Sequence, residues 1–403
     1  MKSGKRLAGV MLAVLGVIGF MVINGCDTEK GEEPVLEWRS TIGEPLLYDT
    51  LSGIIQTSDG GYLARGNRTS SFGDTPTQDV NENFMVKLDE NGNETWRLST
   101  TVSDMKEMGN GNYLFVRYAG RYFLTEIDGS GNMVSDAPVD TSDVIGREFS
   151  STQYHVTADN GCIAINIDDS VMPERLWLTK FNNIGGVVFS LPYEIDMGYP
   201  IVPFANADDG GFVICRNDSG NDQFTSSILK FDSWGELSWT KPLDEVPNVG
   251  TYTKVHAITR IIRLSDGSYL AKGEIAMPQG ISPEGYYGFF VKKISEDGIE
   301  LWHSDFSSRS TFPGDNCMVE TADNDYVICG YKRFYNNLGD ILFGGYDAYL
   351  WITTLDADGA VLMEKGYDAE KYGKGRAICP TEDGGFTIAG TEADDIVIRK
   401  FID

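Results

Sequence analysis

Histidine and cysteine are scarce in this chain of 403 residues, which contains three histidines and six cysteines. His155, His256 and His303 stand far apart without metal-ligand spacing, and no CxxC motif occurs. The HExxH, GxSxG and Walker-type patterns are absent as well. The sequence therefore gives no support for a metal centre, dithiol chemistry, a serine hydrolase or a nucleotide-binding enzyme, and we expect no metal and no cofactor.

Positive charge is also in short supply. Lysine and arginine number 33 against 60 acidic residues, so the formal net charge is −27. Such a chain is repelled by nucleic acid and by anionic lipid surfaces, which argues against either as a partner. Acidic surface loops that keep an exported protein soluble are the simplest explanation of this charge.

Long apolar runs are missing except at the start of the chain. Lys2, Lys5 and Arg6 precede an apolar segment that ends in the sequence VINGC. This order is typical of a bacterial lipoprotein signal, so we expect a signal peptide over residues 1–25, lipid attachment at Cys26 and an acidic tether over 26–34. An uncleaved membrane helix is the alternative, although the apolar run is slightly short for a span.

The five other cysteines are Cys162, Cys215, Cys317, Cys329 and Cys379. Their number is odd, and each stands in a strand-like run, where a free cysteine behaves as a small buried apolar residue. We expect no essential disulfide.

What the sequence does have is a repeat. One phrase returns every 49 to 60 residues, with a Gly, Asn or Asp turn between two apolar runs, which predicts a β-hairpin. The seven copies are SDGGYLARG (from Ser58), GNGNYLFVR (Gly109), ADNGCIAIN (Ala158), DDGGFVICR (Asp208), SDGSYLAKG (Ser265), ADNDYVICG (Ala322) and EDGGFTIAG (Glu382).

A second hairpin phrase, such as FMVKLDENGNETW from Phe84, follows each of the first six copies, but the seventh copy is followed only by IVIRKFID at the end of the chain. Each unit thus has four strands, and the last lacks its fourth. The segment VLEWRST, residues 35–41, matches the missing strand. A ring of four-stranded sheets buries the sheet faces, and pairing the first strand with the last unit would close it. We therefore predict a single all-β domain over 35–403: a seven-bladed β-propeller closed by pairing 35–41 with the C-terminal blade.

The repeat resembles quinoprotein-like and kelch-like propellers in Leu88-Asp89, Gly92 and Trp96, and again in Leu355-Asp356 and Gly359. Together with the signal segment, the DGGY and NGxxxW phrases resemble Bacteroidetes propeller lipoproteins. That resemblance implies an outer-membrane, lipid-anchored protein on the periplasmic or cell-surface side.

Residues that recur at one blade position are expected to pack, whereas residues unique to one blade are candidate site residues. Trp38, Trp96, Trp239 and Trp302 share a fourth-strand position, and Trp177 and Trp351 share a third-strand position. Trp234 stands apart, in a hairpin tip where we expect it to be exposed. The calcium-like stretch from Asp356 to Gly359 occupies an ordinary turn position.

The long connections between second and third strands in blades 5 and 6 carry aromatics that do not recur. These candidate ligand-binding residues are Tyr286, Tyr287, Phe334, Tyr335, Phe343 and Tyr346. Aromatics in such insertions, around the mouth of a propeller's central channel, suit stacking on a sugar or contact with a protein, although the two insertions could instead cover each other.

We therefore predict a monomeric, membrane-anchored, non-catalytic binding protein for a glycan or a protein. The alternatives are a scaffold that assists outer-membrane assembly and, third, a glycan-active hydrolase or lyase. Paired catalytic carboxylates stay open because sequence fixes no distances.

Overall fold

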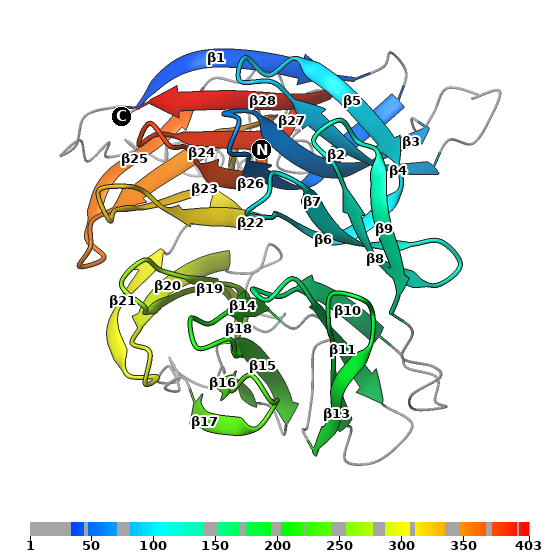
Figure 1. Ribbon diagram of the computed structural model, residues 1–403. Coiled ribbons are helices and arrows are strands. Elements are labelled where there is room, and N and C mark those ends of the chain that lie inside the picture. The colour runs from blue at the N-terminus through cyan, green and yellow to red at the C-terminus, as the bar shows by residue number, and fades with distance from the viewer. Residues whose placement is uncertain are drawn as a thin grey trace, which may run out of the picture.

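The computed structural model is built of strands and turns over the residues that it describes. These are 34–43, 47–70, 81–139, 151–168, 175–194, 203–220, 223–242, 255–276, 287–306, 311–334, 347–367, 373–392 and 395–402. They form seven blades of four antiparallel strands arranged as a propeller, as predicted (Figure 1). The described residues include no helix long and apolar enough to span a membrane. The predicted signal peptide and Cys26 lie outside them.

The strands have the following bounds. Blade 1 contains β2 (Leu47–Gln56), β3 (Tyr62–Ser70), β4 (Asn81–Leu88) and β5 (Glu94–Ser99). Blade 2 contains β6 (Thr101–Glu107), β7 (Tyr113–Tyr118), β8 (Tyr122–Ile127) and β9 (Met133–Pro138). Blade 3 contains β10 (Ser151–Val156), β11 (Cys162–Asp168), β12 (Arg175–Phe181) and β13 (Val187–Glu194). Blade 4 contains β14 (Phe204–Asn206), β15 (Phe212–Gly220), β16 (Gln223–Phe231) and β17 (Leu237–Pro242).

Blade 5 contains β18 (Val255–Arg263), β19 (Tyr269–Ala276), β20 (Tyr287–Ile294) and β21 (Glu300–Phe306). Blade 6 contains β22 (Thr311–Glu320), β23 (Tyr326–Phe334), β24 (Asp347–Leu355) and β25 (Val361–Tyr367). Blade 7 contains β26 (Lys374–Pro380), β27 (Phe386–Glu392), β28 (Asp395–Ile402) and, as its outer strand, β1 (Val35–Ile42).

The turn between the first and second strands explains the repeated glycines. In blade 1 the Gly60 N–H donates to the Thr57 carbonyl at 2.9 Å, and Gly60 has φ 79°. Glycine enters this left-handed region without a steric penalty. Asn160 and Asn324 take the same role in blades 3 and 6 with φ 64°, because asparagine tolerates this conformation better than most residues do.

The N-terminal strand pairs with the C-terminal strand. β1 runs antiparallel to β28, with Val35 opposite Ile402 and Ile42 opposite Ile396. Figure 1 shows the two strands lying side by side, blue beside red. Lys400 Nζ lies 2.7 Å from Glu37 Oε2, and Arg39 Nη2 lies 3.0 Å from Glu392 Oε2, so ion pairs join β1 to its neighbour β28 and to β27, the next strand inward.

Apolar clusters fill the spaces between consecutive blades, including the space between blades 7 and 1. At four of these interfaces the tryptophan on the outer strand of one blade covers the glycine in the outer turn of the next. Trp96 covers Gly131, Trp239 covers Gly298 and Trp302 covers Gly359. Trp38 of β1 covers Gly92 of blade 1 in the same way. The predicted packing role of these four tryptophans is confirmed.

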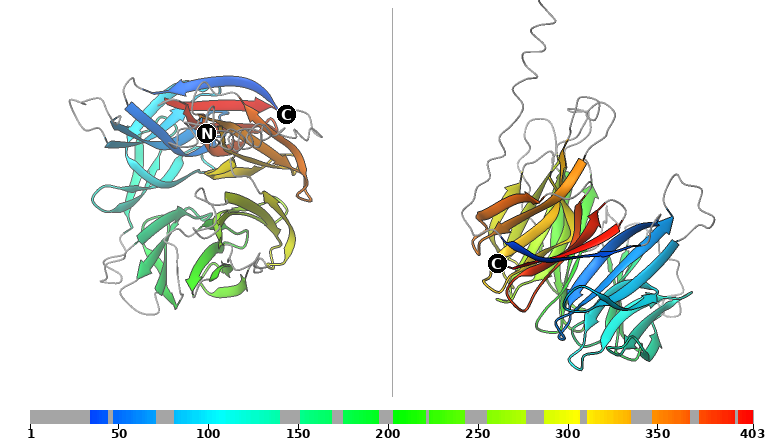
Figure 2. Two further views of the ribbon diagram at one scale, coloured as in Figure 1. Left: turned by 180° about the vertical axis from the view of Figure 1, so that it is seen from behind. Right: turned by 90° about the horizontal axis from the view of Figure 1, so that it is seen from above.

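Blade 7 lies between blade 6 (orange) and blade 1 (blue) in the right-hand view of Figure 2. Blades 6 and 7 also share one parallel bridge between their innermost strands, at Asn316 and Ala377. The five cysteines are buried and Trp234 is 69% exposed, as predicted.

The blade connections divide between the two faces of the ring. The turns from first to second strand and from third to fourth strand lie on one face, which we call the turn face. The connections from second to third strand, and those between blades, lie on the opposite face, which we call the loop face. β1 begins at Val35, opposite the end of β28, and therefore starts on the turn face.

Candidate functional site

Five lysines, four of them buried and Lys400 partly buried, belong to the scaffold. Each stands near the end of a third strand and forms an ion pair with the aspartate in the first turn of its own blade. The Nζ–Oδ distances are 2.9 Å for Lys87–Asp59, 2.7 Å for Lys180–Asp159, 2.6 Å for Lys230–Asp209 and 2.8 Å for Lys293–Asp266, and Lys400–Asp383 completes the set. Because they recur, these charges are structural groups and not site residues.

The first residue of the outer turn is structural too. Asp356 Oδ1 accepts hydrogen bonds from the N–H groups of Asp358 (3.0 Å) and Ala360 (2.8 Å). Asp89, Asp128, Asn182 and Asp232 make the same pair of bonds in their blades. The calcium-like stretch is thus a repeated turn, and no group of metal-ligating side chains occurs among the described residues.

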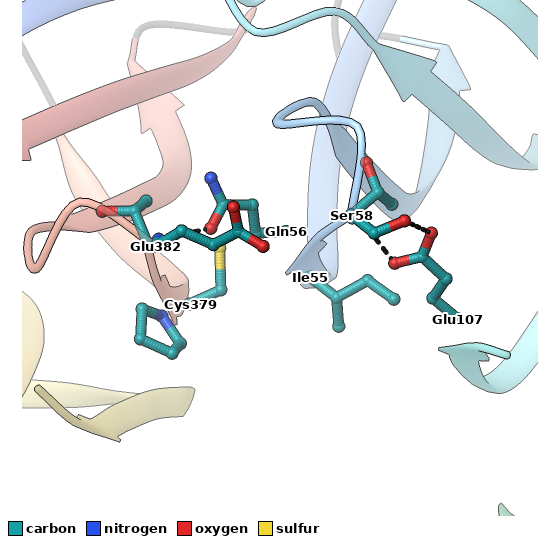
Figure 3. A pocket seen from close by; sticks show the side chains of 9 residues that line it. Ile55, Gln56, Ser58, Glu107, Cys379 and Glu382 are labelled. Atoms are coloured by element: carbon teal, nitrogen blue, oxygen red, sulfur yellow. Dashed lines mark hydrogen bonds between the residues drawn. The ribbon is translucent and has the colours of Figure 1, made fainter. Parts of the chain in front are cut away.

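On the turn face, the last residue of a first strand often holds the turn of the preceding blade. Glu107 accepts hydrogen bonds from the N–H and hydroxyl of Ser58, both at 2.7 Å, and Gln56 accepts one from the Glu382 N–H at 2.8 Å (Figure 3). Glu320 likewise accepts hydrogen bonds from the N–H and the hydroxyl of Ser265. An open pocket of about 450 Å³ lies between these residues of blades 7, 1 and 2, and the side chains of Gln56, Ser58 and Glu107 that line it are already engaged in these hydrogen bonds.

The innermost strands differ from this regular pattern at one position. Three residues before the end of each first strand, or at the matching position of blade 4, stand Gly53, Asp104, Gln153, Pro203, Arg260, Cys317 and Ala377. A β-bulge directly precedes the position in blades 1, 2 and 5, at Ser52, Ser103 and Thr259, and blade 7 has the same bulge at Arg376. Bulges often mark functional positions because they redirect side chains. This position carries no recurring residue type.

Four side chains near this level form what we call the axial cluster: Arg65, Asp104, His155 and Arg260. Arg65 and Asp104 belong to the adjacent blades 1 and 2, whereas Arg260 belongs to blade 5. Arg260 nevertheless interacts electrostatically with both Asp104 and Arg65. Blades this far apart in the ring approach each other only at its axis. All four side chains are partly exposed.

Asp104 is held from three directions. Its Oδ1 accepts from the Met105 N–H and its Oδ2 from the Val156 N–H, both at 2.9 Å, and His155 Nδ1 lies 3.7 Å from Oδ2. Burial by itself would raise the pKa of Asp104. The contact with His155, the charge of Arg65 and the Val156 hydrogen bond outweigh it and lower the pKa, so the carboxylate is charged.

The arginines of the cluster differ in their partners. Arg65 Nη1 donates to the Val102 carbonyl at 2.8 Å and to the Ser103 carbonyl at the bulge of blade 2. Arg260 has no hydrogen-bond or ion-pair partner within the described part of the chain, and its Nε is buried. Burial lowers the pKa of Arg260, and the nearby charge of Arg65 lowers it further, against the opposite effect of Asp104.

A second cation stands directly opposite Arg260 in the blade 5 sheet. Lys272 pairs with Arg260 across β18 and β19 and is almost fully buried. Its Nζ donates to the Gly314 carbonyl at 2.8 Å and lies 3.6 Å from Cys317 Sγ, both in the wide bulge of β22. Gly314 also touches the backbone of Arg376 in blade 7. The bulge of β22 therefore lies between Lys272 of blade 5 and the backbone of Arg376 in blade 7.

The predicted ligand-binding aromatics cannot be placed at this site. Tyr286, Tyr335, Phe343 and Tyr346 lie outside the described residues. Tyr287 begins β20 and Phe334 ends β23, both on the loop face, but their side chains are not described. The axial cluster was missed by sequence reasoning. It could have been found by applying the recurrence test to the first strands, where the blades differ.

No protein-family model matches the chain, and no curated protein matches it in sequence. Solved structures are similar in fold. A protein of unknown function from Dyadobacter fermentans is 8% identical, with a TM-score of 0.46, over 91% of this chain and 98% of that one. A protein of unknown function from Bacteroides caccae is 9% identical, with a TM-score of 0.41, over 74% and 95%.

The GH93 α-L-arabinofuranosidase of Fusarium graminearum in complex with arabinobiose is 10% identical, with a TM-score of 0.42, over 75% of this chain and 92% of that one. At these identities and scores the similarity concerns the propeller fold alone, and it carries no argument about a ligand.

Proposed function

We propose that this protein is a membrane-anchored, non-catalytic binding protein that holds a glycan or protein ligand on the loop face of its propeller, over the axis. The observation that carries this proposal is the break in repetition at the axis. Lysines, aspartates, glycines and tryptophans recur wherever they build the blades, but the axial position differs in every blade. A scaffold without a ligand has no need of charged, partly exposed side chains there.

A binding role fits the axial cluster better than hydrolysis does. Most glycoside hydrolases use two carboxyl groups, one on either side of the scissile bond. Asp104 is the one carboxylate among the described side chains of this level, and backbone N–H groups already occupy both of its oxygens. No described serine, threonine or cysteine at this level contacts His155 as an activated nucleophile would.

The position of β1 supports an orientation with the loop face pointing away from the membrane. If Cys26 carries the lipid, the tether reaches at most about 30 Å before Val35 on the turn face. That face also carries exposed apolar side chains on the outer turns and strands of blades 2 to 5. These are Met133, Val134, Ile184, Val187, Val188, Trp234, Leu237, Ile299 and Leu301. Exposed apolar side chains of this kind suit contact with a zwitterionic lipid surface.

The loop aromatics provide the test of ligand placement. Replacing Tyr286, Tyr287, Phe334 and Tyr335 with serine should abolish binding of a ligand found by a glycan array or a protein pull-down, because each stacked aromatic contributes on the order of 1 kcal/mol. The melting temperature should change little. Trp239→Ser is the matched control, since Trp239 packs between blades 4 and 5 and its loss should lower stability first.

Equal losses of melting temperature in the two variants would show that the loop aromatics are packing residues. The placement of the ligand on the loop face would then be wrong.

A further inference from the structure

Positive charge is concentrated at the axis of a protein that is strongly acidic as a whole. Arg65, Arg260, Arg376 and Lys272 lie on or beside the innermost strands, and Asp104 is the carboxylate that interacts electrostatically with Arg65 and Arg260. The chain as a whole carries a formal charge of −27. A net cationic centre is therefore a local feature that the overall composition opposes.

The described residues leave these cations short of acceptors. Lys272 has a carbonyl oxygen and a thiol, and Arg65 has two carbonyl oxygens. Arg260 and Arg376 have neither a hydrogen bond nor an ion pair with any described residue, and the Nε atom of each is buried without a partner. Asp104 supplies one negative charge near Arg65 and Arg260, but it forms no hydrogen bond or ion pair with either of them in the described part of the chain.

This arrangement is energetically unfavourable without a counter-ion. Like charges directly opposite each other on neighbouring strands destabilise a sheet, and Arg260 and Lys272 are such a pair. A desolvated cation is costly unless a charge or hydrogen-bond acceptor compensates it. A guanidinium group presents five N–H donors whose planar arrangement matches the oxygens of a carboxylate, sulfate or phosphate.

We propose that the axial cluster binds an oxyanion group of the ligand between the guanidinium groups of Arg260 and Arg65. Lys272, directly opposite Arg260, adds positive charge beside the site. The ligand is thus an acidic molecule whose carboxylate, sulfate or phosphate group enters at the axis. This inference rests on the proposed binding function and specifies the chemistry of its ligand.

The test uses the full mature chain carrying Cys26→Ser and titrates it with sodium sulfate and with sodium glucuronate by isothermal calorimetry at low ionic strength. Glucose serves as the neutral control. We expect saturable one-to-one binding of at least one anion and none of glucose. Binding of sulfate alone identifies a sulfate or phosphate group as the ligand chemistry, and binding of glucuronate alone identifies a carboxylate.

The decisive variant is Arg260→Gln, which should weaken anion binding tenfold or more because it removes a charge-assisted, bidentate donor. Its melting temperature in chloride should equal or exceed that of the parent, since an unpaired cation is lost. Arg121→Gln, which changes an exposed arginine of blade 2 away from the axis, should leave both quantities unchanged. Arg260→Lys keeps the charge and should retain part of the affinity.

Two results would overturn the inference. The first is the absence of saturable binding of either anion to the parent chain. The second is an Arg260→Gln variant that melts at a lower temperature and binds anions as the parent does, which would make Arg260 a structural residue. If the ligand screen meanwhile returns a neutral glycan that depends on the loop aromatics, the proposed binding function stands and only the oxyanion site is wrong.

Discussion

The outer strand of blade 7 offers the sharpest test of how the propeller is held together. Trp38→Ala removes a side chain that lies edge-to-face against Tyr62 of blade 1, with ring centroids 5.6 Å apart, and that covers Gly92. A fully buried tryptophan costs about 3 to 5 kcal/mol when truncated to alanine. Trp38 is partly buried, so we expect a loss of about 2 to 3 kcal/mol.

Urea unfolding followed by circular dichroism measures this loss. With a slope of about 3 kcal/mol per molar urea, the midpoint should fall by roughly 0.5 to 1 M. Trp96→Ala is the matched control, because Trp96 covers Gly131 between blades 1 and 2 in the same geometry but lies within the continuous chain. Its loss should be similar if blade 7 closes onto blade 1 as firmly as blade 1 packs on blade 2.

A chain that begins at Gly43 lacks β1 altogether. It loses the ladder to β28, the Lys400–Glu37 and Arg39–Glu392 ion pairs and the buried side chain of Ile42. We expect a larger destabilisation than from Trp38→Ala, together with faster hydrogen exchange at the β28 amides. An unchanged urea midpoint in the truncated chain would refute the stabilising role of β1, because the ring would then be equally stable without this strand.

Three further predictions concern charge and anchoring. Burial opposes ionisation of Asp266, but hydrogen bonds from Lys293 and Ser268 prevail and lower its pKa to about 2; the pair therefore stabilises the fold above pH 4, and this contribution is lost as the pH falls toward 2. Melting curves of Lys293→Met and Asp266→Asn should show a smaller acid dependence than the parent, because the four equivalent pairs remain, and a pH slope equal to the parent's would exclude this pair as a contributor. Ile184→Ser with Trp234→Ser should leave urea unfolding within about 0.5 kcal/mol of the parent but weaken sedimentation of the unlipidated chain with phosphatidylcholine vesicles; equal sedimentation would argue against the turn face as the membrane side. Cys26→Ser should move the protein from the membrane to the soluble fraction, whereas unchanged partition would indicate an uncleaved helix.

The blades could be predicted from the sequence because their information is local. A hairpin needs a turn residue with positive φ between two apolar runs, and both lie within about ten residues, as in the phrase from Ser58 to Gly66. The match between residues 35–41 and the missing fourth strand follows from counting. The recurring tryptophans were identified as packing residues for the same reason, and their position on the next blade's turn glycine explains why the glycine recurs with them.

The axial cluster could not be predicted in this way because it depends on register and on distant blades. The bulge at Thr259 moves Arg260 opposite Lys272, and no local pattern reveals where a strand gains one residue. Arg65 and Arg260 are almost 200 residues apart in the sequence. Lys87 shows the same limit, since lysine is mostly an exposed residue type, yet Lys87 is buried against Asp59 of the preceding turn.

The distribution of charge also explains how one propeller tolerates an irregular centre. The five recurring third-strand lysines are each neutralised by an aspartate of their own blade, so these charges need no partners at the axis for electrostatic balance. Packing between blades is concentrated in the apolar clusters and, toward the rim, in the tryptophan–glycine contacts. The residues at the axial position are therefore not needed to hold the blades together, and they can be substituted without unfolding the propeller. An unpaired Arg260 at that position is costly to keep, and a ligand that supplies its counter-charge gives a physical reason for its presence.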